Sequence, residues 1–146
     1  MKFDIDNVIL TTKEYESKKD ICADIAEHAY NLGLITNKKK IAKGLLEREM
    51  LSSTGFEEGF AIPHVQSKYV KTPALIYYRT NDCDYDSLDG LPTSIFFVIL
   101  VPKDSGSLHL DKLSTLARNL VDIDFKNTMK STDKEEIFKT LSKIIN

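Results

Sequence analysis

Tryptophan is absent from this 146-residue sequence, and cysteine occurs only twice. Cys22 and Cys83 lie far apart and form no Cys-x-x-Cys pair, so neither a zinc-site spacing nor a dithiol redox motif is present, and both thiols are expected to stay reduced. The longest apolar run, residues 95–102, has the length of a strand rather than of a membrane-spanning helix. The first residues show no secretion signal. We therefore expect a cytoplasmic protein with no segment inserted in a membrane.

No sign of charge dominates the sequence. Twenty basic residues face 22 acidic ones, which gives a formal net charge of −2. This balance offers neither an electrostatic signature for nucleic acid nor a polybasic membrane signal. Repeats, low-complexity tracts and linkers rich in Pro, Gly or Ser are also missing. The sequence predicts one domain over residues 1–146, long enough to bury a sizeable core.

Apolar periodicity predicts an α/β fold. A helix is expected over residues 12–32, opened by a capping box of Thr11 and Glu14, and a second helix over residues 37–50. Short segments rich in β-branched and aromatic residues follow, and the last is apolar enough for a central strand covered on both faces. Helical spacing then returns, which predicts a sheet between two helical layers. The expected strands are residues 60–63, 73–79 and 94–102, and the later helices cover residues 113–120 and the stretch from Asp133, opened by Thr132 and Glu135.

His64 is the first candidate for chemistry. It follows Pro63, which lacks an N–H and therefore tends to end strand pairing, so the histidine is expected at the edge of the sheet. Side chains at such places often carry function, although a turn histidine bonded to backbone is the alternative interpretation. His28 shares the apolar face of the first expected helix and is interpreted as structural.

His109 is the second candidate. It lies just inside an expected helix N-terminus capped by Ser105 or Ser107, where free N–H groups and the helix dipole attract anions. An ordinary first-turn surface residue is the alternative. The two histidines have no further ligands at suitable spacing, so no metal site is predicted. Nucleophilic serine or cysteine motifs and glycine-rich phosphate loops are absent, which leaves chemistry on histidine itself.

Residues 46–64, LEREMLSSTGFEEGFAIPH, resemble the signature of enzyme IIA of the bacterial phosphoenolpyruvate-dependent sugar phosphotransferase system, fructose/mannitol class. The matching elements are Arg48-Glu49, Ser53-Thr54-Gly55 and residues 61–64, which end on the phosphorylated histidine. Residues 87–120 resemble a later segment of the same family. The resemblance implies a three-layer α/β/α sandwich with a mixed central sheet. Glu58 is similar to an acidic residue of the mannitol-type members, where the fructose type often has glycine one position earlier.

The resemblance also implies the roles of the site residues. His64 would take a phosphoryl group from the carrier protein HPr and pass it to a cysteine of enzyme IIB, in functional association with the membrane enzyme IIC and without any cofactor. Arg48 would neutralise phosphate charge, because guanidinium matches phosphate geometry. His109 would bond the phosphate or orient His64, and Glu58 would hold Arg48 or His109. Thr54 would offer its hydroxyl to the phosphate, and Phe56 and Phe60 would surround the site.

Two other interpretations stay open. In one, the chain is a nitrogen-type enzyme IIA homologue whose phosphorylation state controls other proteins. In the other, it is a binding domain of the same fold in which His64 is only structural. The presence of Arg48, His64 and His109 together favours phosphoryl transfer.

Overall fold

A mixed β-sheet forms the centre of the molecule in the computed structural model, which describes residues 1–105 and 110–145. Within these residues the sheet has five strands, with β1, β4, β5 and β2 in spatial order and β3 also paired with β5. β4 and β5 are antiparallel, β1 runs parallel to β4, and both β2 and β3 run parallel to β5. The strands are β1 Val8–Leu10, β2 Phe60–Ala61, β3 His64–Ser67, β4 Ala74–Cys83 and β5 Thr93–Pro102.

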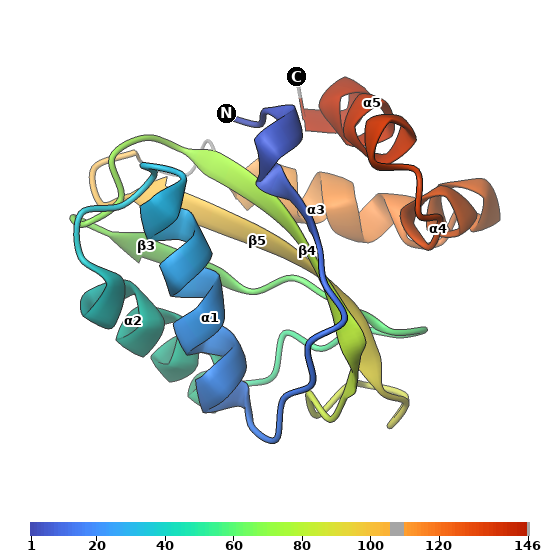
Figure 1. Cartoon of the computed structure of the whole chain (residues 1–146), viewed down its shortest axis with the longest axis horizontal. Coiled ribbons are helices and arrows are strands. Elements are labelled where there is room, and N and C mark those ends of the chain that lie inside the picture. The colour runs from blue at the N-terminus through green and yellow to red at the C-terminus, as the bar shows by residue number, and fades with distance from the viewer. Residues whose placement is uncertain (106–109, 146) are drawn as a thin grey trace.

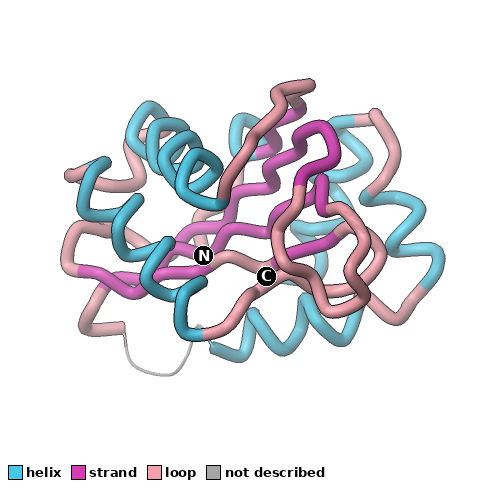
Figure 2. The backbone as a smooth tube through the Cα atoms, turned by 90° about the horizontal axis from the view of Figure 1, so that it is seen from below, coloured by secondary structure: helices cyan, strands magenta, loops and turns pink. Residues whose placement is uncertain are grey.

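Helices cover both faces of this sheet (Figures 1 and 2). α1 and α2 pack on one face, and α3, α4 and α5 pack on the other. The three-layer α/β/α architecture with a mixed sheet is therefore confirmed. The helices are α1 Lys18–Asn31, α2 Lys38–Leu51, α3 Leu110–Asn119, α4 Ile123–Met129 and α5 Lys134–Ile145, and a short 3-10 turn, η1 Ile5–Asn7, precedes β1.

The two long strands alternate their side chains between two cores. In β4, Ile76 and Tyr78 point to the α1–α2 layer, while Leu75 and Tyr77 point to the opposite layer. β5 follows the same rule and is buried on both faces, as its apolar sequence predicted. Such alternation follows from the two-residue period of a strand. It places every residue paired with β5 on a defined face.

Two helices begin later than the sequence predicted. The cap of α1 is Ser17, whose hydroxyl accepts a hydrogen bond from the Asp20 N–H at 3.2 Å. Thr11 instead donates its hydroxyl to the Arg79 carbonyl at 2.8 Å, so it belongs to the edge of the sheet. At α5, Asp133 rather than Thr132 is the cap, since its carboxylate accepts from the Glu136 N–H at 3.2 Å.

Pro63 interrupts a strand instead of ending it. β2 stops at Ala61, and pairing with β5 resumes at His64, which lies opposite Ile99. Between these segments the Pro63 carbonyl still accepts a hydrogen bond from the Ile99 N–H at 3.0 Å. Proline has no N–H to donate back to β5, so the pairing is interrupted at this residue. His64 therefore begins a strand rather than following one.

Candidate functional site

His64 lies at the sheet edge and opens into a cleft of about 320 Å³. Its pairing partner Ile99 belongs to the core beneath α3–α5, so the imidazole projects toward the α3 side. Arg48 reaches the same cleft from the last turn of α2. The cleft thus joins a strand edge to two helices, and it is lined by Arg48, Ser53, Thr54, Gly55, Phe56, Ile62, His64, Leu88, Leu113, Ser114 and Ala117.

Two hydrogen bonds define the protonation state of His64. Its Nδ1 lies 2.9 Å from the Ile62 carbonyl oxygen, which can only accept, so Nδ1 carries the proton. Its Nε2 lies 3.1 Å from Nε of Arg48, which can only donate, so Nε2 holds a lone pair. The site therefore holds a neutral imidazole with a basic nitrogen turned toward a guanidinium.

The surroundings lower the pKa of His64 below its ordinary value of 6.5. Burial is the main cause because it disfavours the charged ring, and the positive charge of Arg48 acts in the same direction. The hydrogen bond to Ile62 and the negative charge of Glu49 oppose this shift. At neutral pH the ring is neutral and able to act as a nucleophile.

Arg48 is fixed by the end of its own helix. Its Nη1 donates to the Ser52 carbonyl at 2.9 Å, just beyond the last residue of α2. A basic side chain is favourable at this position because helix carbonyls leave partial negative charge there. With Nη1 and Nε both engaged, the plane of the guanidinium is set relative to His64.

Glu49 is a buried charge at this site, and the family signature includes it in the Arg48-Glu49 pair without assigning it a role. Only 5% of the residue is exposed, and its carboxylate accepts from the Thr54 N–H at 2.8 Å, from the Thr54 hydroxyl and from Lys18 Nζ at 3.2 Å. Lys18 also donates to the Ser53 hydroxyl at 2.8 Å. This network anchors the wall of the cleft to the start of α1.

Thr54 lines the cleft, but its hydroxyl hydrogen bond goes to Glu49. A carboxylate cannot donate, so the Thr54 hydroxyl must, and only its oxygen lone pairs remain for the cleft. The next residue, Gly55, has no room for a side chain because the connection between β4 and β5 passes close to it. A Cβ at Gly55 would lie 2.9 Å from the Tyr85 carbonyl oxygen and from Ser87 Cα.

The phenylalanines and Glu58 differ from expectation in part. Phe56 lines the cleft, whereas Phe60 is fully buried and stacks on Phe97 at 5.9 Å between ring centroids, so it does not surround the site. Glu58 occupies a turn with φ of 58°, and its carboxylate pairs with Lys126 of α4 rather than with Arg48. Of the two contacts expected for Glu58, the one with Arg48 is replaced by the pair with Lys126, and the one with His109 falls outside the described residues.

His109 lies outside the described residues. α3 is described from Leu110, and its Leu113 and Ser114 border the cleft, so the beginning of that helix lies beside His64. Within residues 1–105 and 110–145, no group of three or more His, Cys, Asp or Glu side chains could hold a metal ion. Over the same residues, no helix combines the length and apolarity needed to cross a bilayer.

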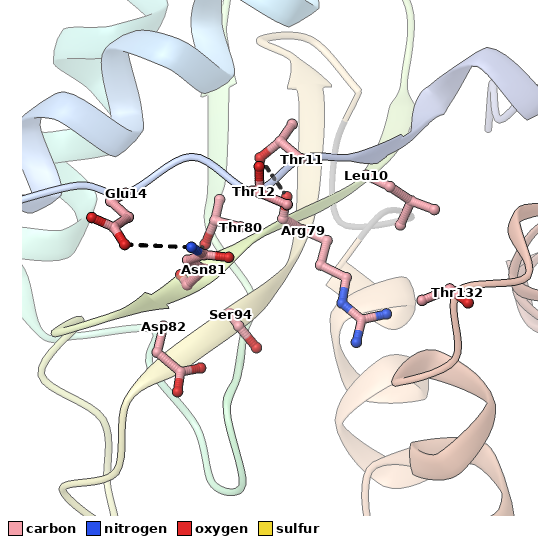
Figure 3. Close-up of a pocket in the computed structure, with 10 residues that line it drawn as sticks. All are labelled: Leu10, Thr11, Thr12, Glu14, Arg79, Thr80, Asn81, Asp82, Ser94 and Thr132. Atoms are coloured by element: carbon pink, nitrogen blue, oxygen red, sulfur yellow. Dashed lines mark hydrogen bonds between the residues drawn. The ribbon is translucent and has the colours of Figure 1, made fainter.

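A larger cavity, of about 830 Å³, lies at the other end of the sheet (Figure 3). Arg79 projects into it from β4, and its guanidinium bonds the Lys130 carbonyl at 2.7 Å and the Ser131 carbonyl. Arg79 thus caps the end of α4. Asn81 is in turn held by Glu14 at 3.5 Å. Unlike the His64 cleft, this cavity contains no histidine or cysteine among its lining residues.

Comparison with known proteins places this chain in the enzyme IIA family of the sugar phosphotransferase system. Residues 1–144 match the family of the "Phosphoenolpyruvate-dependent sugar phosphotransferase system, EIIA 2", and the chain belongs to that family. It is 31% identical over 128 residues to the fructose-specific EIIABC component of Bacillus subtilis, covering 87% of this chain but only 20% of that protein. It is also 32% identical over 136 residues to a nitrogen regulatory protein of Bradyrhizobium diazoefficiens, covering 92% of this chain and 88% of that protein.

Solved structures agree with this family. The nitrogen regulatory protein IIA-Ntr of Neisseria meningitidis superposes with a TM-score of 0.85 at 28% identity, over 94% of both chains. The IIA mannitol structure of Escherichia coli gives a TM-score of 0.78 at 16% identity, over 97% of this chain and 99% of that one. The latter likeness shows the shared fold alone.

Proposed function

We propose that the protein carries a phosphoryl group on His64, accepting it from phosphorylated HPr and passing it to a cysteine of an enzyme IIB for sugar uptake. The observation that supports this most directly is the neutral imidazole whose Nε2 faces Arg48 at 3.1 Å. A nucleophilic nitrogen beside a guanidinium is what phosphoryl transfer requires, because the loose transition state needs positioning and charge stabilisation.

Nε2 is the nitrogen that attacks. In the accepting step the bond from phosphorus to the donor imidazole breaks while the bond to Nε2 forms. Arg48 then turns its donors from Nε2 to the phosphate oxygens, which it can bind bidentately. The proton on Nδ1 stays in its bond to the Ile62 carbonyl. The phosphorylated ring is then an imidazolium, which is a good leaving group for the onward step.

Glu49 and Arg48 act on this ring in opposite directions. Arg48 keeps the unphosphorylated imidazole neutral, whereas the negative charge of Glu49 favours the cationic ring. An imidazolium formed on phosphorylation is thus stabilised by a buried carboxylate that does not touch it. Thr54 connects Glu49 to the cleft wall, because its N–H and its hydroxyl both donate hydrogen bonds to that carboxylate. His109 is proposed to contact the phosphate, as the family resemblance implies.

Protein partners must reach His64 in turn. Met50 and Leu51 at the end of α2 are 77% and 83% exposed, and Leu88 at the cleft is 72% exposed. Apolar side chains around a reactive group suit a docking surface shared by successive partners. Escherichia coli enzyme IIAMtl, which shares the fold, has been solved in complex with phosphorylated enzyme IIBMtl. An enzyme IIB domain is accordingly the proposed acceptor here.

Phosphorylation with phosphoenolpyruvate, enzyme I and HPr tests the proposal. The wild-type protein is expected to gain one acid-labile phosphoryl group by intact mass, whereas His64→Ala gains none. His28→Gln is the matched control, since His28 lies on α1 against Tyr78, at 5.2 Å between ring centroids, and should be phosphorylated normally. In protein labelled with ¹⁵N-histidine, the phosphoryl group should shift the Nε2 resonance of one ring. Phosphorylation of His64→Ala would overturn the assignment.

A regulatory role is the second candidate, because the nitrogen regulatory proteins match this chain over a comparable length. Both roles share the first phosphoryl transfer and differ in the second. A transport protein should lose its phosphoryl group to the cysteine of a cognate enzyme IIB, and then to sugar when enzyme IIC is added. A phosphorylated protein that keeps its group under these conditions would favour the regulatory role.

A further inference from the structure

Seven lysines gather at one end of the molecule, and none of them lines the His64 cleft. We call this surface the basic end and define it as Lys38, Lys39, Lys40, Lys43, Lys68, Lys71 and Lys103, all of which are exposed. They come from the start of α2, the connection from β3 to β4, and the turn after β5, which lie together at the left of Figure 1.

Backbone hydrogen bonds hold these segments together. The Thr36 N–H donates to the Tyr69 carbonyl at 2.9 Å, and the Lys71 N–H donates to the Leu34 carbonyl at 3.0 Å. The side-chain amide of Gln66 donates to the Lys103 carbonyl at 3.0 Å. The lysines are therefore gathered by the fold and do not depend on a flexible tail.

The surface is strongly one-signed although the whole chain is nearly balanced. Residues 28–46 and 59–81 contain no aspartate or glutamate. The neighbouring acidic residues are Glu27, which pairs with Lys38 at 2.8 Å, Glu47, which pairs with Lys43 at 3.8 Å, and Asp104 beside Lys103. Seven positive and three negative charges give the basic end a charge of +4. Because the whole chain has a net charge of −2, all the other residues together carry −6.

Helix stability does not explain these lysines. Three of them, Lys38 to Lys40, occupy the first turn of α2, which contains no acidic residue. The helix dipole makes that end positive, so acidic side chains are favourable there and lysines are unfavourable. Because these lysines do not stabilise the helix dipole, they are available to an external anion.

We propose that the basic end binds the surface of an anionic lipid bilayer. A protein partner would need an apolar centre, and the exposed large apolar residues of the described chain lie elsewhere, apart from Tyr30 at the margin. Nucleic acid would use arginine and open aromatic faces. Here the cluster holds no arginine, and the Tyr30 and Tyr69 rings are each covered by a lysine ammonium at 5.3 Å. Dispersed lysines match the diffuse charge of lipid headgroups.

Vesicle co-sedimentation with the full chain tests this proposal. The probes are vesicles of phosphatidylglycerol and phosphatidylcholine in equal parts, with pure phosphatidylcholine for comparison. Binding should require phosphatidylglycerol and weaken as salt rises, because exposed charges are screened. Each lysine near an anionic surface contributes about fivefold to partitioning, so Lys39→Gln/Lys40→Gln/Lys71→Gln should bind about 100-fold more weakly.

Lys134→Gln/Lys139→Gln/Lys143→Gln is the matched control, with the same charge change on exposed residues of α5. It should bind vesicles within about twofold of wild type, because these lysines lie outside the basic end. Equal loss in both triple variants would overturn the proposal, as would the absence of phosphatidylglycerol-dependent binding at low salt. Tighter binding to duplex DNA or to polyglutamate than to the vesicles would also overturn it and indicate the other class of partner.

Discussion

Replacing Glu49 by glutamine removes a buried charge while keeping the shape of the side chain. The change leaves Lys18 without its anionic partner, whose carboxylate side chain is only 1% exposed. Breaking a buried ion pair from one side costs about 3–5 kcal/mol. Lys18 keeps 20% of its side chain exposed and can recover part of its hydration, so we expect a loss of about 2–3 kcal/mol.

Urea denaturation followed by far-UV circular dichroism measures this loss, since tryptophan fluorescence is not available in this chain. Glu47→Gln is the matched control on the same helix. Its carboxylate is 63% exposed and its pair with Lys43 spans 3.8 Å, so the change should stay within about 0.5 kcal/mol. If the free energy of unfolding of Glu49→Gln also lies within about 0.5 kcal/mol of wild type, the network around Lys18 contributes nothing measurable to stability.

A second readout separates a purely structural role from an electrostatic one. The charge of Glu49 raises the pKa of His64 against the effects of burial and Arg48. Its removal should lower the His64 pKa further, as measured by NMR titration of the ring. An unchanged or raised His64 pKa in Glu49→Gln would contradict the proposed stabilisation of a cationic ring.

Two other predictions concern His64 and the strand it begins. The folded-state pKa of His64 lies below its ordinary value of 6.5, so the unfolded chain binds more protons as pH falls through that value. The contribution of His64 to stability should be complete above pH 6.5 and decrease below it. His64→Gln should therefore lose less stability than wild type on acidification from pH 7, and equal losses would contradict this. Gly44→Ala adds a Cβ 2.8 Å from Cγ2 of Val65 in β3. Overpacking of about 1–3 kcal/mol should outweigh the gain of about 1 kcal/mol in helix propensity, so urea denaturation should show that Gly44→Ala destabilises the wild-type protein but not the Val65→Ala variant. Stabilisation of the single variant would contradict the close packing of α2 on β3.

Periodicity predicted the elements that are long or strongly apolar. The central strand β5 and the helix α2 lie close to their predicted positions, because one is apolar throughout and the other has an asparagine cap at Asn37. β1, with three residues, and α4, with seven, are too short to show a period. β3 was missed because its sequence, HVQS, is largely polar, and only its pairing with β5 makes it a strand.

The sequence likewise predicted only part of the candidate site. The family signature brought Arg48 and His64 together, and the structure places them in contact. Glu49 was named in the signature, but its burial was not predicted, because a glutamate in the run Glu47-Arg48-Glu49 is typical of a solvated helix face. Its burial depends on Lys18, 31 positions earlier, and on Thr54 in the next loop. Sequence spacing on one helix cannot reveal a partner supplied by another.

α2 and β3 connect the cleft to the basic end without merging them. α2 begins with the lysines and carries Arg48 in its last turn, while β3 begins with His64 and leads to Lys68. Nine residues separate Lys39 from Arg48, which is about 14 Å along the helix axis and exceeds the screening length of about 8 Å at physiological ionic strength. Lys39 and Lys40, in the first turn of α2, therefore contribute little to the potential at Nε2. Neutralising Lys39, Lys40 and Lys71 should weaken vesicle binding about 100-fold while leaving the rate of phosphorylation by HPr unchanged. A bilayer held at the basic end would thus leave the His64 cleft open to its protein partners, so membrane attachment and phosphoryl transfer can proceed on the same molecule at once.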